Sequence, residues 1–379
     1  MGRGAEGGYL SMKLLFCIKA MNNPGGGAER VLADVANGLL SRQHDVGVLT
    51  FEQSGGQSFY PLDARIQRLD LGIGSTVSSA TVNETLRRII ALRRQVADYR
   101  PDVAIGFMHS MFVPLGLALV GTSIPMIASE HIVPEHYQTR PKREGLLLKL
   151  TPFLVRKITC VSEAVRQSYS PPLQKRMVVM PNPITLNVTR LANPLGQPGQ
   201  SKILLAVGRL EDQKDHLTLI HAFAKIADGL PNWVLRIVGE GSLRSTLTAA
   251  IQSLGLESRI QLPGSNPNIA AEYQAAQLFV IPSRYESLGL TVIEAIAHGL
   301  AAVGFQDCPG VNQVIQPGSN GILVSNMPDR ISALAISLKA LMLDNGKRQR
   351  LSKESACILK EYDLQAVLSK WETLLRTCQ

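Results

Sequence analysis

Cysteine is scarce and scattered in this chain of 379 residues. The five cysteines are odd in number and lack metal-type spacing, which is typical of a reduced, cytosolic protein rather than a disulfide framework. The sequence contains no Asp-x-Asp pair to hold a divalent cation. The glycine-rich stretch at 21–30, after the first expected strand, is not the G-x-G-x-x-G fingerprint that would predict a nicotinamide cofactor. It also lacks the aromatic-interleaved, zinc-finger and recognition-helix patterns of nucleic-acid-binding proteins, so no nucleic-acid partner is expected.

No signal-peptide pattern and no uninterrupted membrane span are visible. Residues 1–11 are glycine-rich and polar, so we expect a disordered or non-native leader ahead of a fold that starts near Met12. The 18 residues from Met111 to Ala128 carry no charge, which is close to the length of a transmembrane helix. Pro114 and Gly121 are among the residues that interrupt this run. It therefore predicts a short buried helix, a turn and a buried strand.

Charge is unevenly distributed along the chain. Residues 1–190 hold 22 Lys and Arg against 14 Asp and Glu, a net charge of +8, whereas residues 191–379 hold 17 against 16, a net charge of +1. The first half is therefore predicted to face an acidic partner, either an anionic membrane surface or a polyanionic acceptor. The apolar fraction of 45% and charged fraction of 18% are those of a soluble globular protein.

Short apolar runs alternate with helical patterns in two series. The run 186–200 between them is rich in Pro, Gly and Asn, as linkers are. Such alternation predicts two doubly wound, Rossmann-like α/β domains facing across a cleft, one at 12–185 and one at 201–360. A C-terminal helix in 361–379 is expected to cross back to the first domain. The expected strands are 14–18, 46–51, 103–107, 126–129 and 157–161, then 203–207, 234–238, 259–262, 278–281 and 301–304.

The segment from Ser283 to Ala295 predicts a loop that runs into a helix, with a carboxylate on each side of the turn. Unpaired backbone N–H groups at 288–290 would point outward at the helix start, where the helix dipole favours anions. Glu286 and Glu294 would accept hydrogen bonds from hydroxyl groups on either side of a phosphate. This arrangement fits a nucleotide-sugar, but two solvated glutamates on an amphipathic helix would show the same spacing.

Two cationic side chains follow the strand expected at 203–207. Arg209 offers a planar guanidinium fork for phosphate oxygens, and Lys214 offers a mobile ammonium. Together they would neutralise a diphosphate without a metal ion, and surface solvation is the alternative for either one. Gly239 and Gly264 end the next two expected strands, where tight turns would frame a flat base through backbone groups. A glycine after a strand is, however, usually only a turn.

A known family shows the same ordered set of motifs. The set comprises Gly208-Arg209-Leu210 with Lys214, Val238-Gly239-Glu240-Gly241, Pro282-Ser283, and Glu286-Ser287-Leu288-Gly289-Leu290 followed by Glu294. Across the second domain and most of the first, the chain resembles the retaining family-4 glycosyltransferases of the GT-B fold. One departure is Ser287-Leu288, where many relatives carry Pro or Gly followed by an aromatic residue. We expect this departure to retune the donor pocket slightly.

The resemblance implies a role for each matching residue in the second domain. Arg209 and Lys214 would bind the nucleotide diphosphate and the charge that builds on it as the sugar leaves. Glu294 would accept from the ribose and Glu286 from the donor sugar. The backbone at 287–290 (Ser287, Leu288, Gly289 and Leu290) would contact sugar and phosphate.

The resemblance also reaches three places in the first half. Gly26 and Gly27 lie in a glycine-rich stretch that would let the backbone pass close to the donor phosphate, or that forms a flexible turn. His109 follows the strand expected at 103–107 and matches a position where related enzymes place a His near the donor sugar. Glu130 and His131 lie in a stretch similar to that of amino-sugar transferases acting on lipid-linked glycans, and are expected to face the acceptor hydroxyl.

Basic residues beside apolar runs predict contact with a membrane. Arg140–Arg143 precede an apolar run at 146–150, and the pairs at 87–88 and 93–94 lie on an amphipathic pattern. Each such charge favours an anionic interface by about 1 kcal/mol. Helices that pack one face on the core and expose a charged face to solvent would show the same pattern. The excess of positive charge in the first half favours membrane contact over this alternative.

The residues and the resemblance together predict a retaining, metal-independent hexosyltransferase. It would move a hexose or N-acetylhexosamine from a nucleotide diphosphate sugar, expected to be UDP-linked, to a membrane-anchored glycan lipid in polysaccharide assembly. No cofactor is expected, and the enzyme would sit peripherally on the cytoplasmic face of the membrane. Two alternatives remain open: a nucleotide-sugar 2-epimerase on the same fold, and a nucleotide-sugar-binding protein without catalysis.

Overall fold

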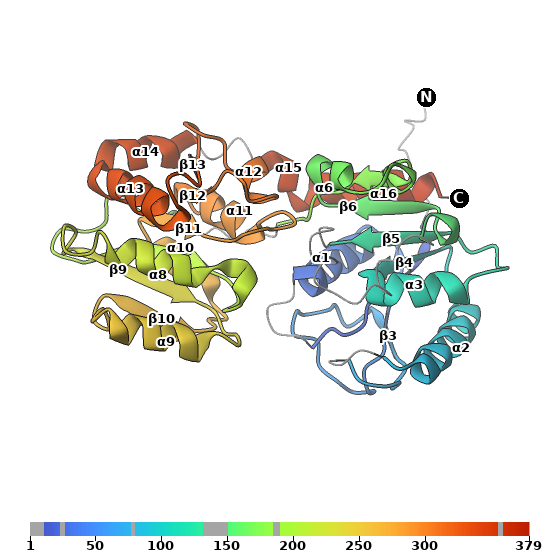
Figure 1. Ribbon diagram of the computed structural model, residues 1–379. Coiled ribbons are helices and arrows are strands. Elements are labelled where there is room, and N and C mark those ends of the chain that lie inside the picture. The colour runs from blue at the N-terminus through green and yellow to red at the C-terminus, as the bar shows by residue number, and fades with distance from the viewer. Residues whose placement is uncertain are drawn as a thin grey trace, which may run out of the picture. The chain divides into compact units, whose positions relative to one another are not determined.

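The computed structural model describes residues 11–22, 27–76, 80–131, 151–184, 190–354 and 359–378. The chain divides into two compact units, with unit 1 made of residues 1–183 and 364–379 and unit 2 made of residues 184–363. Each unit is a parallel sheet with helices packed on it (Figure 1). The two doubly wound α/β sheets predicted from the alternating pattern are therefore confirmed.

Unit 1 contains a seven-stranded sheet in the order β3-β2-β1-β4-β5-β6-β7. The strands are β1 Lys13–Cys17, β2 Asp45–Thr50, β3 Gln67–Asp70, β4 Val103–Phe107, β5 Met126–Glu130, β6 Lys157–Cys160 and β7 Met177–Val179. The residues of β4 and β5 are buried throughout, as expected for strands covered on both faces. The strand order reverses between β1 and β4, and such a switch point is where ligands bind beyond the carboxyl ends of the strands.

The chain's last long helix completes the core of unit 1. Unit 1 contains α1 Gly27–Ser41, α2 Val82–Tyr99, α3 His109–Ala118, α6 Glu163–Ser168, α7 Pro171–Gln174 and α16 Leu364–Arg376. Trp371 of α16 joins the core beside Phe16 of β1, with ring centroids 6.4 Å apart. Gly38 of α1 lets α16 approach, because a Cβ there would lie 2.6 Å from Leu368. The Arg42 guanidinium ties the two helices by donating to Glu372 at 2.7 Å.

Unit 2 contains a six-stranded parallel sheet in the order β10-β9-β8-β11-β12-β13. Its strands are β8 Lys202–Val207, β9 Trp233–Val238, β10 Ile260–Gly264, β11 Leu278–Ile281, β12 Ala302–Phe305 and β13 Gly321–Val324. Its helices are η1 Asp212–Lys214, α8 His216–Ala224, α9 Arg244–Ser253, α10 Ile269–Ala275, α11 Leu290–Ala297, α12 Val311–Val314, α13 Arg330–Leu343, α14 Asn345–Glu354 and α15 Leu359–Tyr362. The order reverses between β8 and β11, so the loops after these strands meet at one edge.

The uncharged run from Met111 to Ala128 forms most of α3, a turn and the start of β5. This agrees with the helix, turn and strand expected there. Within the described ranges, no helix is both long and apolar enough to cross a bilayer.

Candidate functional site

The glycines that end β8, β9 and β10 lie on adjacent loops of unit 2. The Gly208 amide donates to the Val238 carbonyl at 3.0 Å, and the Gly239 amide donates to the Gly264 carbonyl at 3.0 Å. Gly239 has a φ of +150°, and a Cβ there would lie 2.1 Å from the Gly208 carbonyl oxygen. Only glycine fits this position.

Lys214 and Glu286 form a close ion pair at the same edge. The Lys214 ammonium lies 2.5 Å from Glu286 Oε1, and the Ser283 hydroxyl donates to the same oxygen at 2.7 Å. The two charged side chains are only 14% and 10% exposed. The structure thus brings together two predicted site residues from distant parts of the sequence, and adds Ser283 as their shared partner.

Two neighbouring segments hold the loop that carries Glu286. The Gln213 carbonyl accepts from the Arg284 amide at 2.9 Å, and the Gln213 side chain donates to the Tyr285 carbonyl at 2.8 Å. On the other side, the Glu286 amide donates to the Pro309 carbonyl at 3.0 Å. Gly310 permits this approach, because a Cβ there would lie 2.4 Å from the Glu286 carbonyl oxygen. The carboxylate therefore sits on a braced loop.

Helix α11 begins directly after this loop, at Leu290, with Gly289 at a φ of +70°. Among the residues that the structure describes, the amides of Ser287, Leu288, Gly289 and Leu290 have no acceptor in the protein. The Leu288 side chain is buried, so this residue presents its backbone. Unpaired amides at a helix start favour an anion. They were predicted at 288–290, and the structure adds Ser287.

Glu294 lies one turn inside α11 and is almost fully buried. One of its carboxylate oxygens accepts from the Tyr273 hydroxyl at 2.8 Å. Tyr273 comes from α10 and stacks on His298, with ring centroids 5.1 Å apart. The sequence did not indicate Tyr273, because no local motif joins α10 to α11. The only available signal is that a buried tyrosine usually needs a hydrogen-bond partner.

Arg209 lies on the loop after β8, but its side chain is 56% exposed and pairs with Glu211 at 3.0 Å. The structure therefore does not join it to the Lys214–Glu286 pair. His216 lies beneath the same loop, where burial and the nearby Lys214 ammonium lower its pKa to about 4. Its imidazole is thus neutral near pH 7 and does not compete with Lys214 as a cation.

Arg330 supports the site from α13 and was not identified from the sequence. Its guanidinium donates to the carbonyls of Pro282 and Ser283, each at 3.3 Å. It also pairs with Asp307 at 3.0 Å and lies 3.7 Å from the centroid of Phe305. Arg330 therefore fixes the start of the loop that carries Glu286.

In unit 1, a strained residue precedes His109. Met108 has φ 65° and ψ 150°, a conformation that is rare for any residue other than glycine. The Met108 amide donates to the Ser129 carbonyl at 3.0 Å, and α3 then starts at His109. Strain of this kind gathers at functional sites, which agrees with the predicted role of His109 without testing it.

His131 and Glu130 lie beside this corner, at the carboxyl end of β5. The His131 ring stacks on Phe107 with centroids 5.1 Å apart, and its Nε2 lies 2.9 Å from the Ser129 hydroxyl. Burial lowers the pKa of His131 to about 4, so the imidazole is neutral near pH 7. Glu130 is buried, and its carboxylate accepts the His131 amide at 3.0 Å. The carboxylate thus shapes the end of β5, and its predicted contact with an acceptor stays a prediction.

Several predicted features lie outside the described residues. Gly26, the basic run 140–143, the apolar run 146–150 and residues 1–10 lie outside them. Gly27 is described as the exposed first residue of α1. Among the described residues, no group of three His, Cys, Asp or Glu is placed to hold a metal ion.

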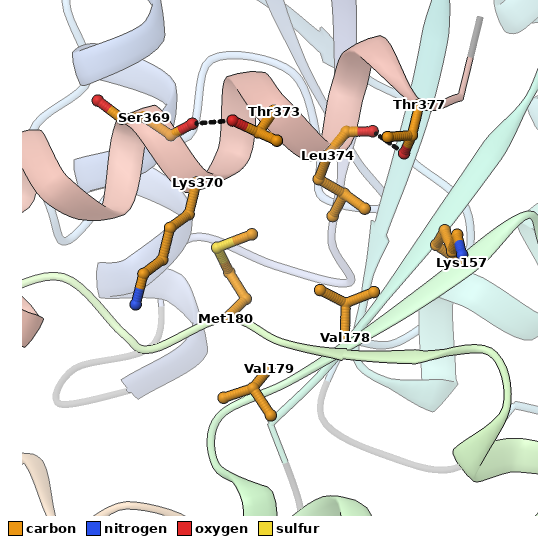
Figure 2. A pocket seen from close by; sticks show the side chains of 9 residues that line it. All are labelled: Lys157, Val178, Val179, Met180, Ser369, Lys370, Thr373, Leu374 and Thr377. Atoms are coloured by element: carbon orange, nitrogen blue, oxygen red, sulfur yellow. Dashed lines mark hydrogen bonds between the residues drawn. The ribbon is translucent and has the colours of Figure 1, made fainter.

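A groove of about 450 Å³ lies in unit 1, between α16 and strands β6 and β7. Figure 2 shows Lys370 toward one end and Lys157 toward the other, with apolar side chains such as Met180 and Val178 between them. The predicted site residues are absent from its lining.

Comparison with known proteins places both units among glycosyltransferases. Residues 25–188 match the family model described as Glycosyltransferase Family 4, and residues 187–356 match the one described as Glycosyl transferases group 1. The chain is 26% identical over 360 residues to an uncharacterized glycosyltransferase of Haemophilus influenzae, covering 92% of this chain and 96% of the relative.

A second relative has a named reaction. The chain is 25% identical over 370 residues to a Campylobacter jejuni alpha-1,4-N-acetyl-D-galactosaminyltransferase, covering 96% of this chain and 98% of that one. The name of that enzyme specifies a diNAcBac-PP-undecaprenol-linked GalNAc acceptor.

Solved structures share the fold over almost the full length of the chain. Sucrose-phosphate synthase from Thermosynechococcus elongatus has a TM-score of 0.81 at 18% identity, covering 96% of this chain and 98% of that chain. The Anabaena protein HepE, in complex with UDP and glucose, has a TM-score of 0.78 at 19% identity, covering 97% of this chain and 100% of that chain. These likenesses confirm the GT-B fold.

Proposed function

Because the chain belongs to the GT-B glycosyltransferases, with a Glycosyltransferase Family 4 domain followed by a group 1 domain, we propose that it transfers a hexose or N-acetylhexosamine from a UDP-sugar to a membrane-anchored glycan lipid. One observation carries the donor half of this proposal. Lys214 of η1 pairs with Glu286, which lies on the braced loop that leads into the unpaired amides at 287–290. A cation beside a helix start suits a diphosphate, and an adjacent carboxylate suits sugar hydroxyls.

The leaving diphosphate would be the main target of catalysis. A lysine ammonium has three donors, so Lys214 can keep Glu286 and still donate to a phosphate oxygen. The amides at 287–290 would donate to the same charge, and preorganised donors of this kind stabilise a transition state more than a ground state. Arg209 would also bind the diphosphate, because its long side chain is exposed and its planar guanidinium matches two phosphate oxygens.

The two glutamates would orient the rest of the donor. Glu294 would accept from the ribose while Tyr273 holds its carboxylate in place. Glu286 would accept from hydroxyls of the sugar, and His109 would lie near the sugar from unit 1. The family resemblance supports retention of the anomeric configuration by front-face attack, without a metal ion.

The proposed acceptor is a lipid-linked glycan at the cytoplasmic face of the membrane, in polysaccharide assembly. The acceptor named for the Campylobacter jejuni relative supports this choice. So does the net charge of +8 on residues 1–190, since an anionic surface attracts a basic protein. The UDP bound by HepE supports UDP as the nucleotide.

Calorimetry against UDP-, GDP- and ADP-sugars, followed by incubation with lipid-linked acceptors, tests the proposal. We expect selective binding of a UDP-sugar, a glycosylated lipid as product, and an anomeric configuration matching the donor by NMR. A sugar altered without any acceptor would indicate an epimerase instead. Binding of UDP without product from any acceptor would favour a non-catalytic binding protein, and failure to bind any nucleotide-sugar would refute the donor site.

A further inference from the structure

Helix α2 of unit 1 presents an apolar stripe to solvent. Val82, Leu86 and Ile90 are spaced four residues apart and therefore lie on one face of the helix. Their exposed fractions are 70%, 53% and 54%. A helix on a globular protein normally turns such a stripe toward the core, so this one is available to a partner.

The opposite face of α2 already has a complete set of contacts. The Arg88 guanidinium donates to the carbonyls of Ile73 and Ser75 at 3.1 and 2.9 Å, and lies 4.4 Å from the centroid of Phe51. Leu92 and Val96 are buried on the same side. The exposed stripe is therefore not a core face that lacks its neighbour. The membrane contact expected for Arg88 is wrong, because its side chain is used inside unit 1.

Arg93 is also used within unit 1. Its guanidinium donates to the carbonyls of Ala118 and Val120, both at 2.9 Å, which fastens α2 to the end of α3. Val120 is itself 58% exposed, which adds apolar surface at this point.

The two remaining arginines of α2, Arg87 and Arg94, are exposed and lie along one edge of the stripe, beside Ile90. They are seven residues apart, which is two helical turns or about 10 Å along the axis. Both border a shallow groove of about 430 Å³ whose lining includes Ile90 and Leu71. Neither makes a hydrogen bond or an ion pair with any residue that the structure describes. A guanidinium without a protein partner is well suited to bind a phosphate.

We propose that α2 docks unit 1 onto an anionic phospholipid bilayer, an inference that rests on the proposed membrane-anchored acceptor. Val82, Leu86 and Ile90 enter the boundary between headgroups and acyl chains, and Arg87 and Arg94 bind lipid phosphates. This is the geometry of a helix that lies in the membrane interface. Charge complementarity favours a bilayer over a second copy of the chain, because the same basic surface would repel itself.

The test uses the full chain and vesicles of phosphatidylcholine with and without phosphatidylglycerol. In co-sedimentation, R87Q/R94Q should weaken binding to the anionic vesicles about 30-fold, since each basic residue contributes about 5-fold. The matched control is K175Q/K370Q, which removes the same charge from two exposed lysines elsewhere on unit 1 and should change binding only slightly. L86S/I90S should weaken binding about 10-fold or more, whereas I336S/L343S, which changes two exposed residues of α13, should not.

Equal losses in a variant and its control would overturn the proposal, because binding would then follow overall charge or hydrophobicity. So would a concentration-dependent dimer that L86S/I90S abolishes, since the stripe would then bind another copy. UDP-sugar binding and transfer to a detergent-dispersed acceptor separate this proposal from the function. If α2 is only a docking helix, R87Q/R94Q still binds the UDP-sugar and still transfers the sugar to the dispersed acceptor. If the unaltered chain neither binds nor transfers, the proposed function itself is refuted.

Discussion

Replacement of the ion pair between Lys214 and Glu286 separates its contribution to stability from its contribution to catalysis. The ammonium lies 2.5 Å from the carboxylate, and both side chains are nearly buried. A hydrogen bond between charged groups contributes about 1.5–3 kcal/mol, and breaking a fully buried pair costs about 3–5 kcal/mol. Because some exposure remains, we expect Lys214→Met to lower the free energy of unfolding by about 2–3 kcal/mol.

The double variant K214M/E286Q should recover much of this loss, because no buried charge is then left without a partner. Chemical denaturation of both single variants and the double variant would give the coupling energy, expected at about 1.5 kcal/mol or more. For a unit of this size, the loss in K214M corresponds to a Tm lower by about 5–10 °C.

Catalysis should not recover with stability. Lys214→Met should lower kcat about 100- to 1,000-fold, as expected for loss of one preorganised donor to a developing charge. The double variant should be at least as slow despite its restored Tm. If the losses of stability in K214M and E286Q simply add in the double variant, the pair has no structural role. Near-normal transfer by K214M or by the double variant would refute the catalytic role of Lys214.

Three further predictions concern the neighbouring groups. Tyr273→Phe should weaken UDP binding in calorimetry about 10-fold, because Glu294 loses a charged hydrogen bond. Glu294→Ala should weaken UDP binding by orders of magnitude. Equal effects of the two variants would contradict the assignment of Glu294 as the group that binds the ribose and Tyr273 as its support. Gly239→Ala should lower the free energy of unfolding by about 3 kcal/mol or more through its clash and its positive φ, while Gly229→Ala, which meets no atom closer than 3.7 Å, should be nearly neutral. The pKa of His131 falls from 6.5 to about 4 on folding, so the unfolded chain binds more protons between these pH values. The free energy of unfolding should therefore fall as the pH drops through this window, by up to about 1.4 kcal/mol per pH unit. If His131→Gln leaves the dependence of the unfolding free energy on pH unchanged, His131 is not its source.

The strands that the sequence predicted well are those covered on both faces. Strands 103–107 and 278–281 were predicted with the bounds that the structure shows, because full burial in a parallel sheet makes each a continuous apolar run. The three strands that were missed, β3, β7 and β13, all lie at sheet edges. Edge strands are short and partly exposed, so β3 reads Gln-Arg-Leu-Asp and has no apolar pattern to detect.

The pattern along the chain was enough for the fold class, and it also predicted the types of group expected at a donor site. A lysine after one strand and two glutamates around a helix start indicated an anion and its hydroxyl neighbours before any contact was known. The pairing of Lys214 with Glu286, the support of Glu294 by Tyr273 and the anchoring by Arg330 emerged from the folded chain alone. These contacts join separate crossovers of one parallel sheet, and strand order and register set their distances. Periodicity reports which face of an element is buried, but it carries no information on which element lies opposite.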